Sequence, residues 1–189
     1  MREILLGILA SLFFAVTFIL NRSMEISGGS WIWSSSLRYF FMLPFLFIIV
    51  YYRKGLSPTY KEIKSAPAAW FLWSFVGFVL FYAPLTFAAA YGPGWLISGM
   101  WQFTIVAGVL LAPLFFIKIE NRIIKQKIPV VSLFISLLIL VGIILIQIPN
   151  TDTVNLQMIF LGILPVLIAA FAYPLGNRKM MEHLTGRLD

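Results

Sequence analysis

Cysteine is absent from the 189 residues of this chain, and histidine occurs once, at His183. The lack of cysteine excludes disulfides, thiolate metal sites and cysteine nucleophiles. Charged residues are also scarce, at 11% of the chain, whereas soluble domains carry about 25%. Apolar residues make up 61%, well above the roughly 45–50% of a soluble domain. This composition indicates a protein that resides in a membrane.

Apolar segments of membrane-spanning length recur along the chain. About 18 to 20 uncharged residues cross a bilayer as a helix, and we predict six such spans. They cover residues 3–20, 31–52, 68–90, 95–117, 129–148 and 156–175. The predicted connections are a short polar link at 21–30, a loop at 55–67, a tight turn at 91–94, a charged connection at 118–127 and a polar turn at 149–155, with a polar terminus from 176. The predicted fold class is therefore all-α, a polytopic transmembrane bundle of about six helices.

Basic residues are distributed unevenly between the predicted loops. With the N-terminus inside, the inner segments hold twelve of the 14 Lys and Arg residues, the outer loops hold Arg22 alone, and Arg38 lies within a span. This asymmetry predicts that both ends of the chain are cytoplasmic, in an inner or plasma membrane. The net charge of +7 is thus explained by topology, and we expect no nucleic-acid partner.

Two stretches about 155 positions apart resemble each other, SLFFAVTFILNRSM at 11–24 and LIAAFAYPLGNRKM at 167–180. They belong to the first and sixth predicted spans, which cross the membrane in opposite directions. An inverted-topology repeat requires opposite directions, and many secondary transporters are built from such repeats. The alternative is chance similarity between two helices rich in Leu, Phe and Ala. A true repeat predicts four further spans, and hence that the chain is part of a longer transporter.

The third to fifth spans carry a family resemblance. The stretch APLTFAAAYGPGWLISGMWQFTIVAGVLLAPLFF at 83–116, followed by IPVVSLFISLLILVGIILIQ at 128–147, resembles helices three to five of the drug/metabolite transporter superfamily (EamA-like proteins). Within it, MWQFTIVAGVLLAP at 100–113 is most similar to the multidrug resistance efflux transporters. Larger members have two inverted five-helix repeats. The resemblance therefore implies a first repeat at 1–155, the first helix of a second repeat at 156–189, and efflux of a small organic solute or drug by alternating access.

The sequence departs from this family pattern in three places. Many relatives place Gly-Glu after the fourth helix, where this chain reads KIENR, and many carry a proline where this chain has Trp101 and Gln102. The small four-helix relatives exchange protons through a glutamate in their first helix. At the comparable depth this chain has Phe13, Phe14 and Thr17.

The seven carboxylates all fall in predicted loops or at span ends. They are Glu3, Glu25, Glu62, Glu120, Asp152, Glu182 and Asp189. The interior of the predicted spans therefore holds no carboxylate that could bind and release a proton for antiport. An enzyme acting within the membrane would need a nucleophile with a base, or a metal cluster, at that depth. We accordingly expect no enzymatic activity, no catalytic residues, no metal and no cofactor.

Arg38 is the one charged residue inside a predicted span. It lies about eight residues into the second span, roughly 12 Å along a helix, which is near the middle of a bilayer core. A charge at that depth is either a binding group for an anionic or zwitterionic solute or a structural arginine that bonds carbonyls or reaches the interface. Ser34, one turn earlier, is predicted to share its polar face.

The fourth span offers a second group of candidate binding residues. Trp101 is suited to stack on a ring or a cation of the substrate, and Gln102 to orient it by a hydrogen bond. Ser98 lies at helical spacing from both, and Tyr82 in the third span is a weaker candidate. The alternative is that Gln102 bonds a neighbouring helix while Trp101 only packs.

Two functions remain open from the sequence. The first is a transporter whose partners are the lipid bilayer and a small-molecule substrate. The second is a non-transporting membrane subunit or half-module that assembles with another chain. If the chain is complete, the second possibility predicts a dimer.

Overall fold

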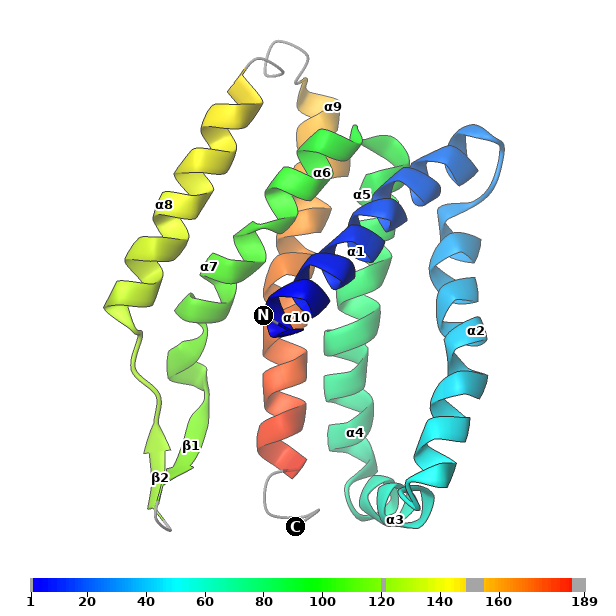
Figure 1. The fold of residues 1–189 in the computed structure, drawn as a ribbon, viewed down its shortest axis with the longest axis vertical. Helices are drawn as coiled ribbons and strands as arrows, with labels where there is room; N and C mark the ends of the chain where they lie inside the picture. The colour runs from blue at the N-terminus through cyan, green and yellow to red at the C-terminus, as the bar shows by residue number, and fades with distance from the viewer. Residues whose placement is uncertain (1, 120–121, 149–154, 185–189) are drawn as a thin grey trace.

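The computed structural model describes residues 2–119, 122–148 and 155–184. Within them, five helical segments are long and apolar enough to cross a membrane, and a sixth apolar segment, Gly94–Leu110, is shorter. Successive segments run in opposite directions, and the last runs opposite to the first, which starts at mid-height and is tilted against the others (Figure 1). The predicted polytopic helical bundle is thereby confirmed, whereas the inverted repeat and the two-part division of the chain stay predictions.

The elements follow one another in a simple order. The helices are α1 (Arg2–Ile26), α2 (Trp31–Tyr52), α3 (Leu56–Ser65), α4 (Pro67–Ser74), α5 (Leu80–Tyr91), α6 (Gly94–Trp101), α7 (Phe103–Leu110), α8 (Val130–Gln147), α9 (Leu156–Met158) and α10 (Leu164–Leu184). A π-helical turn, Phe75–Val79, joins α4 to α5, and another, Ile159–Ile163, joins α9 to α10. Two strands, β1 (Phe116–Ile119) and β2 (Arg122–Lys125), precede α8.

Several helices continue beyond the predicted spans. The link predicted at 21–30 is helical to Ile26 and turns only at Gly28, whose φ of 87° suits glycine. The predicted loop at 55–67 contains α3, and the predicted polar terminus is helical to Leu184. The link at 21–30 and the loop at 55–67 were wrong predictions because hydropathy marks the depth of the lipid, whereas a helix can extend into the aqueous layer. The terminus was predicted only to be polar, which its helical residues to Leu184 do not contradict. The turn predicted at 91–94 is confirmed; residues 149–154 and 185–189 lie outside the described residues.

The fourth span differs most from its prediction as one helix over 95–117. It is broken at Gln102 into α6 and α7, and its helix ends at Leu110. Beyond it, β1 and β2 pair as an antiparallel hairpin in which Phe116 lies opposite Lys125. This hairpin replaces much of the predicted charged connection and is an exception to the all-α prediction.

α5 and α10 form the centre of the bundle (Figure 1). Both helices contribute small residues to the buried core, namely Ala88, Ala89, Ala169 and Ala172. Further along, Gly176 of α10 meets the π-helical turn so closely that an added Cβ would overlap the backbone of Gly77. Close backbone packing of this kind holds helices together in lipid, where apolar burial gives no driving force.

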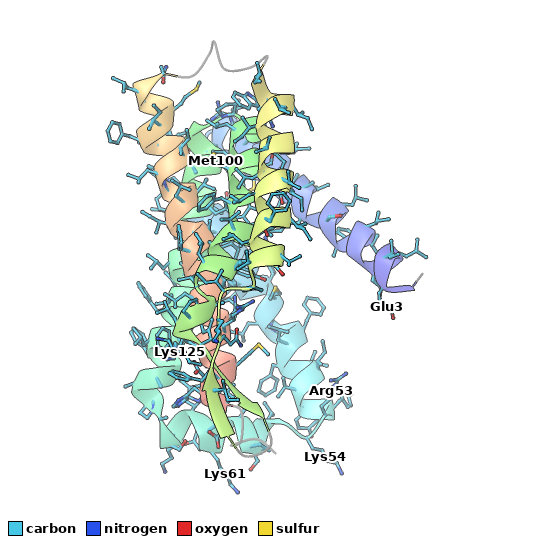
Figure 2. The ribbon with its side chains drawn as sticks, turned by 90° about the vertical axis from the view of Figure 1, so that its left-hand side faces the viewer. Glu3, Arg53, Lys54, Lys61, Met100 and Lys125 are labelled. Atoms are coloured by element: carbon cyan, nitrogen blue, oxygen red, sulfur yellow. The ribbon has the colours of Figure 1, made fainter. Side chains whose placement is uncertain are left out.

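The surface and the buried polar groups both suit a bilayer. α1, α2 and α8 expose large apolar side chains, and the N-terminal half of α1 stands away from the other helices (Figure 2). The buried serines and threonines of the described residues are Ser34, Ser35, Thr86 and Ser136. Each donates to a backbone carbonyl three or four residues earlier in the chain, so no partner from water is needed.

Candidate functional site

An open pocket of about 450 Å³ lies between five spans. Its lining residues are Phe14, Arg38, Phe81, Trp101, Gln102, Thr104, Ile105 and Tyr173. They come from α1, α2, α5, both halves of the broken fourth span, and α10. The pocket is therefore an aromatic-walled space with one positive charge, and we call it the Arg38 pocket.

Tyr82 holds the guanidinium of Arg38. Nη1 of Arg38 donates a hydrogen bond to Tyr82 Oη at 2.8 Å, and its guanidinium carbon lies 4.7 Å from the centre of the Tyr82 ring. Tyr82 is 3% exposed and packs edge-on against Tyr39, with the ring centres 5.3 Å apart. These contacts fix where the charge of Arg38 is presented.

Among the residues that the structure describes, no carboxylate forms an ion pair with Arg38. A cation at membrane depth is costly without a counter-ion, and a phenol hydroxyl and a π face compensate only part of that cost. A negatively charged group entering the Arg38 pocket would supply the rest.

Four aromatic rings form the wall beside this charge. The ring centre of Trp101 lies 5.1 Å from Phe81, 5.8 Å from Tyr173 and 5.9 Å from Phe14. Phe81 and Tyr173 are themselves 4.9 Å apart. Because these rings come from four separate spans, a planar or apolar solute body would contact all of those spans at once.

Gln102 occupies the break between α6 and α7. Its N–H bonds the Gly99 carbonyl at 3.2 Å, and its own carbonyl accepts from the Ile105 N–H at 3.1 Å, so the turn is tighter than an α-helix. The Trp101 carbonyl accepts a hydrogen bond from the Thr104 hydroxyl at 2.6 Å. Broken helices inside a membrane are tolerated where they line a cavity, and they often mark the binding sites of transporters.

Comparison with known proteins gives the family. The sequence profile of the EmrE family, described as "Putative multidrug resistance efflux transporter", matches residues 1–189. The chain belongs to this family. The match confirms the resemblance to drug/metabolite transporters, and the EmrE-family chain is a multi-pass membrane protein.

Two curated relatives resemble this EmrE-family chain along its whole length. "Uncharacterized protein YjlA" of Bacillus subtilis (strain 168) is 61% identical over 193 residues, which cover 100% of this chain and 60% of that protein. "Uncharacterized 42.1 kDa protein in intracellular alkaline protease 3'region" of Shouchella clausii is 53% identical over 190 residues, covering 100% of this chain and 50% of that protein. The chain thus spans half to three fifths of the length of these relatives. No solved structure matches it.

The structure brings together four of the six binding residues predicted for this EmrE-family chain. They are Arg38, Trp101 and Gln102, which line the pocket, and Tyr82, which holds Arg38. The other two lie outside the lining. Ser34 donates to the Ser30 carbonyl at 3.3 Å and Ser98 to the Trp95 carbonyl at 3.2 Å, so both hydroxyls are engaged within their helices.

Three aromatic lining residues were not among the predicted binding residues: Phe14, Phe81 and Tyr173. Aromatic residues make up 16% of the chain, so their presence in a span singles none of them out. Only the packing of α1, α5 and α10 shows which of them face Trp101.

Proposed function

We propose that the protein is a transporter that exports a small organic solute by alternating access. Membership in a family described as efflux transporters supports transport and its direction. The observation that carries the assignment of the site is the Arg38 guanidinium beside the Trp101 ring cluster, which has no carboxylate partner among the residues that the structure describes. The preferred solute then combines an anionic or zwitterionic group with an aromatic or apolar body.

The positions of these residues suggest how binding and transport are coupled. Phe14 and Arg38 belong to α1 and α2, whereas Tyr82 and Tyr173 belong to the central pair α5 and α10. A solute that binds between them links elements that move relative to each other when two halves rock about a central site. The proposal needs no covalent chemistry and assigns no enzymatic step.

Three naphthalene probes of equal ring size but different charge test the site. We expect naphthalene sulfonate to bind the purified protein more tightly than naphthol, and naphthyl trimethylammonium to bind least. Arg38→Gln should weaken sulfonate binding by about 10-fold or more, since a charged hydrogen bond contributes roughly 1.5–3 kcal/mol. Naphthol binding should not change. Arg53→Gln, an exposed cation at the end of α2, is the matched control and should behave like the wild type.

Flux separates transport from binding alone. Vesicles containing the protein should release naphthalene sulfonate saturably, and Arg38→Gln should abolish that release. Binding with no flux would favour the alternative of a non-transporting subunit that assembles with another chain. If the ammonium probe binds best and Arg38→Gln leaves all three affinities unchanged, Arg38 is a structural residue and the proposed site is wrong.

A further inference from the structure

A second pocket, of about 650 Å³, lies beside the β-hairpin. It is formed by the end of α7, the end of β2 and the residues that follow it, the start of α8 and the C-terminal part of α10. It shares no lining residue with the Arg38 pocket. We call it the hairpin pocket, and the transport proposal does not use it.

Three cations from different segments line the hairpin pocket: Lys125, Lys127 and Arg178. Arg178 is anchored, because its Nη1 donates to the Gly108 carbonyl at 3.3 Å and its guanidinium carbon lies 5.2 Å from the centre of the Phe115 ring. Among the residues that the structure describes, no carboxylate lines the pocket. The cations therefore converge on one space without an acidic partner in that lining.

The carboxylate of Glu182, on the same helix as Arg178, is already engaged. Its Oε1 accepts from the Phe116 N–H at 2.8 Å and its Oε2 accepts from Lys179 Nζ at 2.7 Å. Glu182 thus ties α10 to the hairpin and pairs with Lys179. Glu182 does not line the hairpin pocket.

The hairpin pocket lies where the lipid-facing surface of α8 begins. Val130 and Val131, in the first turn of α8, are 74% and 73% exposed, and both are apolar. Lys127 stands three residues before Val130 in the sequence. Lys125 lies at the same end of the molecule as Arg53 and Lys61 (Figure 2). A basic pocket next to an apolar helix surface is at the level expected for lipid headgroups.

We propose that the hairpin pocket binds the phosphate group of an anionic phospholipid, whose acyl chains lie along α8. Lys125, Lys127 and Arg178 supply the positive charge, and basic pockets at helix ends are known to hold such headgroups. The apolar part of the lining, including Val109 and Ile124, suits the glycerol backbone of a lipid better than a fully hydrated inorganic anion.

Lipid titration of the purified protein in a neutral detergent tests the proposal. The probes are short-chain phosphatidylglycerol and phosphatidylcholine, and the readouts are the bound lipid in native mass spectrometry and the thermal unfolding midpoint. The double variant Lys125→Gln, Lys127→Gln should bind phosphatidylglycerol about 25-fold more weakly, because each basic group near a headgroup contributes roughly a factor of five. The matched control, Lys61→Gln with Lys64→Gln, removes the same charge from α3 and should keep most of the affinity.

Comparison of the variants and of the ligands decides whether the hairpin pocket is a defined site for an anionic lipid. Equal losses in the two double variants would show general attraction to the basic end and overturn a defined site. Equal stabilisation by phosphatidylcholine, or by inorganic phosphate alone, would overturn the anionic lipid as ligand. Lys125→Arg with Lys127→Arg keeps both charges, so it should retain binding; if it loses binding as the Gln pair does, the charge-based site is wrong.

Discussion

Replacing Gly176 by alanine is expected to separate α10 from the π-helical turn of the third span. The added Cβ would overlap the backbone N and Cα of Gly77 and lie 2.9 Å from the Val76 carbonyl carbon. All three atoms are backbone, so no side chain can rotate away. Restoring a normal contact distance requires the helices to move apart by roughly 1 Å.

Two other glycines provide graded controls for this change. A Cβ on Gly77 would lie 3.3 Å from the backbone of Gly176 and Asn177, and a Cβ on Gly142 in α8 would meet nothing within 4 Å. Overpacking costs about 1–3 kcal/mol and occasionally more, whereas Gly to Ala in a helix gains up to about 1 kcal/mol from propensity. Gly142→Ala should therefore stabilise slightly, Gly77→Ala should be near neutral, and Gly176→Ala should lose at least roughly 1–2 kcal/mol.

The assay is thermal unfolding of the three variants in one detergent, with naphthalene sulfonate binding as a second readout. Gly176→Ala should lower the midpoint by several degrees, at about 2–4 °C per kcal/mol for a chain of this size. It should also weaken sulfonate binding, because Tyr173 lies one turn before Gly176 and belongs to the ring cluster. If Gly176→Ala unfolds at the same temperature as Gly142→Ala, the close approach of α10 to Gly77 is wrong.

Substitutions at three further residues probe the contacts of individual side chains. Tyr82→Phe keeps the ring but removes the hydroxyl that orients Arg38, so sulfonate affinity should fall about fivefold, as expected for roughly 1 kcal/mol, and an unchanged affinity would contradict that role. Trp101→Ala removes three ring contacts and should weaken the binding of all three naphthalene probes about tenfold, whereas Trp101→Phe should retain most of the affinity. Glu182→Ala removes the oxygen that accepts from the Phe116 N–H, so hydrogen exchange at the Phe116 amide should become faster, with little change in the unfolding midpoint because the Lys179 pair is partly exposed. Unchanged exchange would count against the tie between α10 and the hairpin.

Hydropathy predicted the number and order of the spans because lipid depth imposes an apolar composition on any helix that crosses it. It could not predict α3 or the last turns of α10, since these polar helices depend on local backbone hydrogen bonds. The break at Gln102 also escaped prediction, because neither proline nor glycine stands at that position. The hairpin does have a sequence signal, since four isoleucines flank the dipeptide EN within residues 116–125, and β-branched residues around polar ones are typical of strands.

The candidate site was predictable where a residue is costly in a membrane. Arg38 and Gln102 could be selected from sequence because a polar side chain in a span needs a partner. Trp101 could be selected because it adjoins Gln102. The partners themselves depend on which helices are neighbours, so Tyr82 as the group that holds Arg38, and Tyr173 as part of the ring cluster, follow only from the fold.

α10 connects the features on which both proposals depend. Within two turns it places Tyr173 in the ring cluster, Gly176 against Gly77, and Arg178 in the hairpin pocket. A helix that is packed backbone to backbone at Gly176 cannot rotate about its own axis without a clash, so Tyr173 and Arg178 must move together with the third span. In the transport cycle proposed above, α10 and α5 would then be displaced as one body relative to α1 and α2. The Arg38 pocket lies across that boundary, since Arg38 is carried by α2 whereas Tyr82 and Tyr173 are carried by the central pair. A solute bound there would contact both bodies at once, which is what coupling of binding to their relative motion requires.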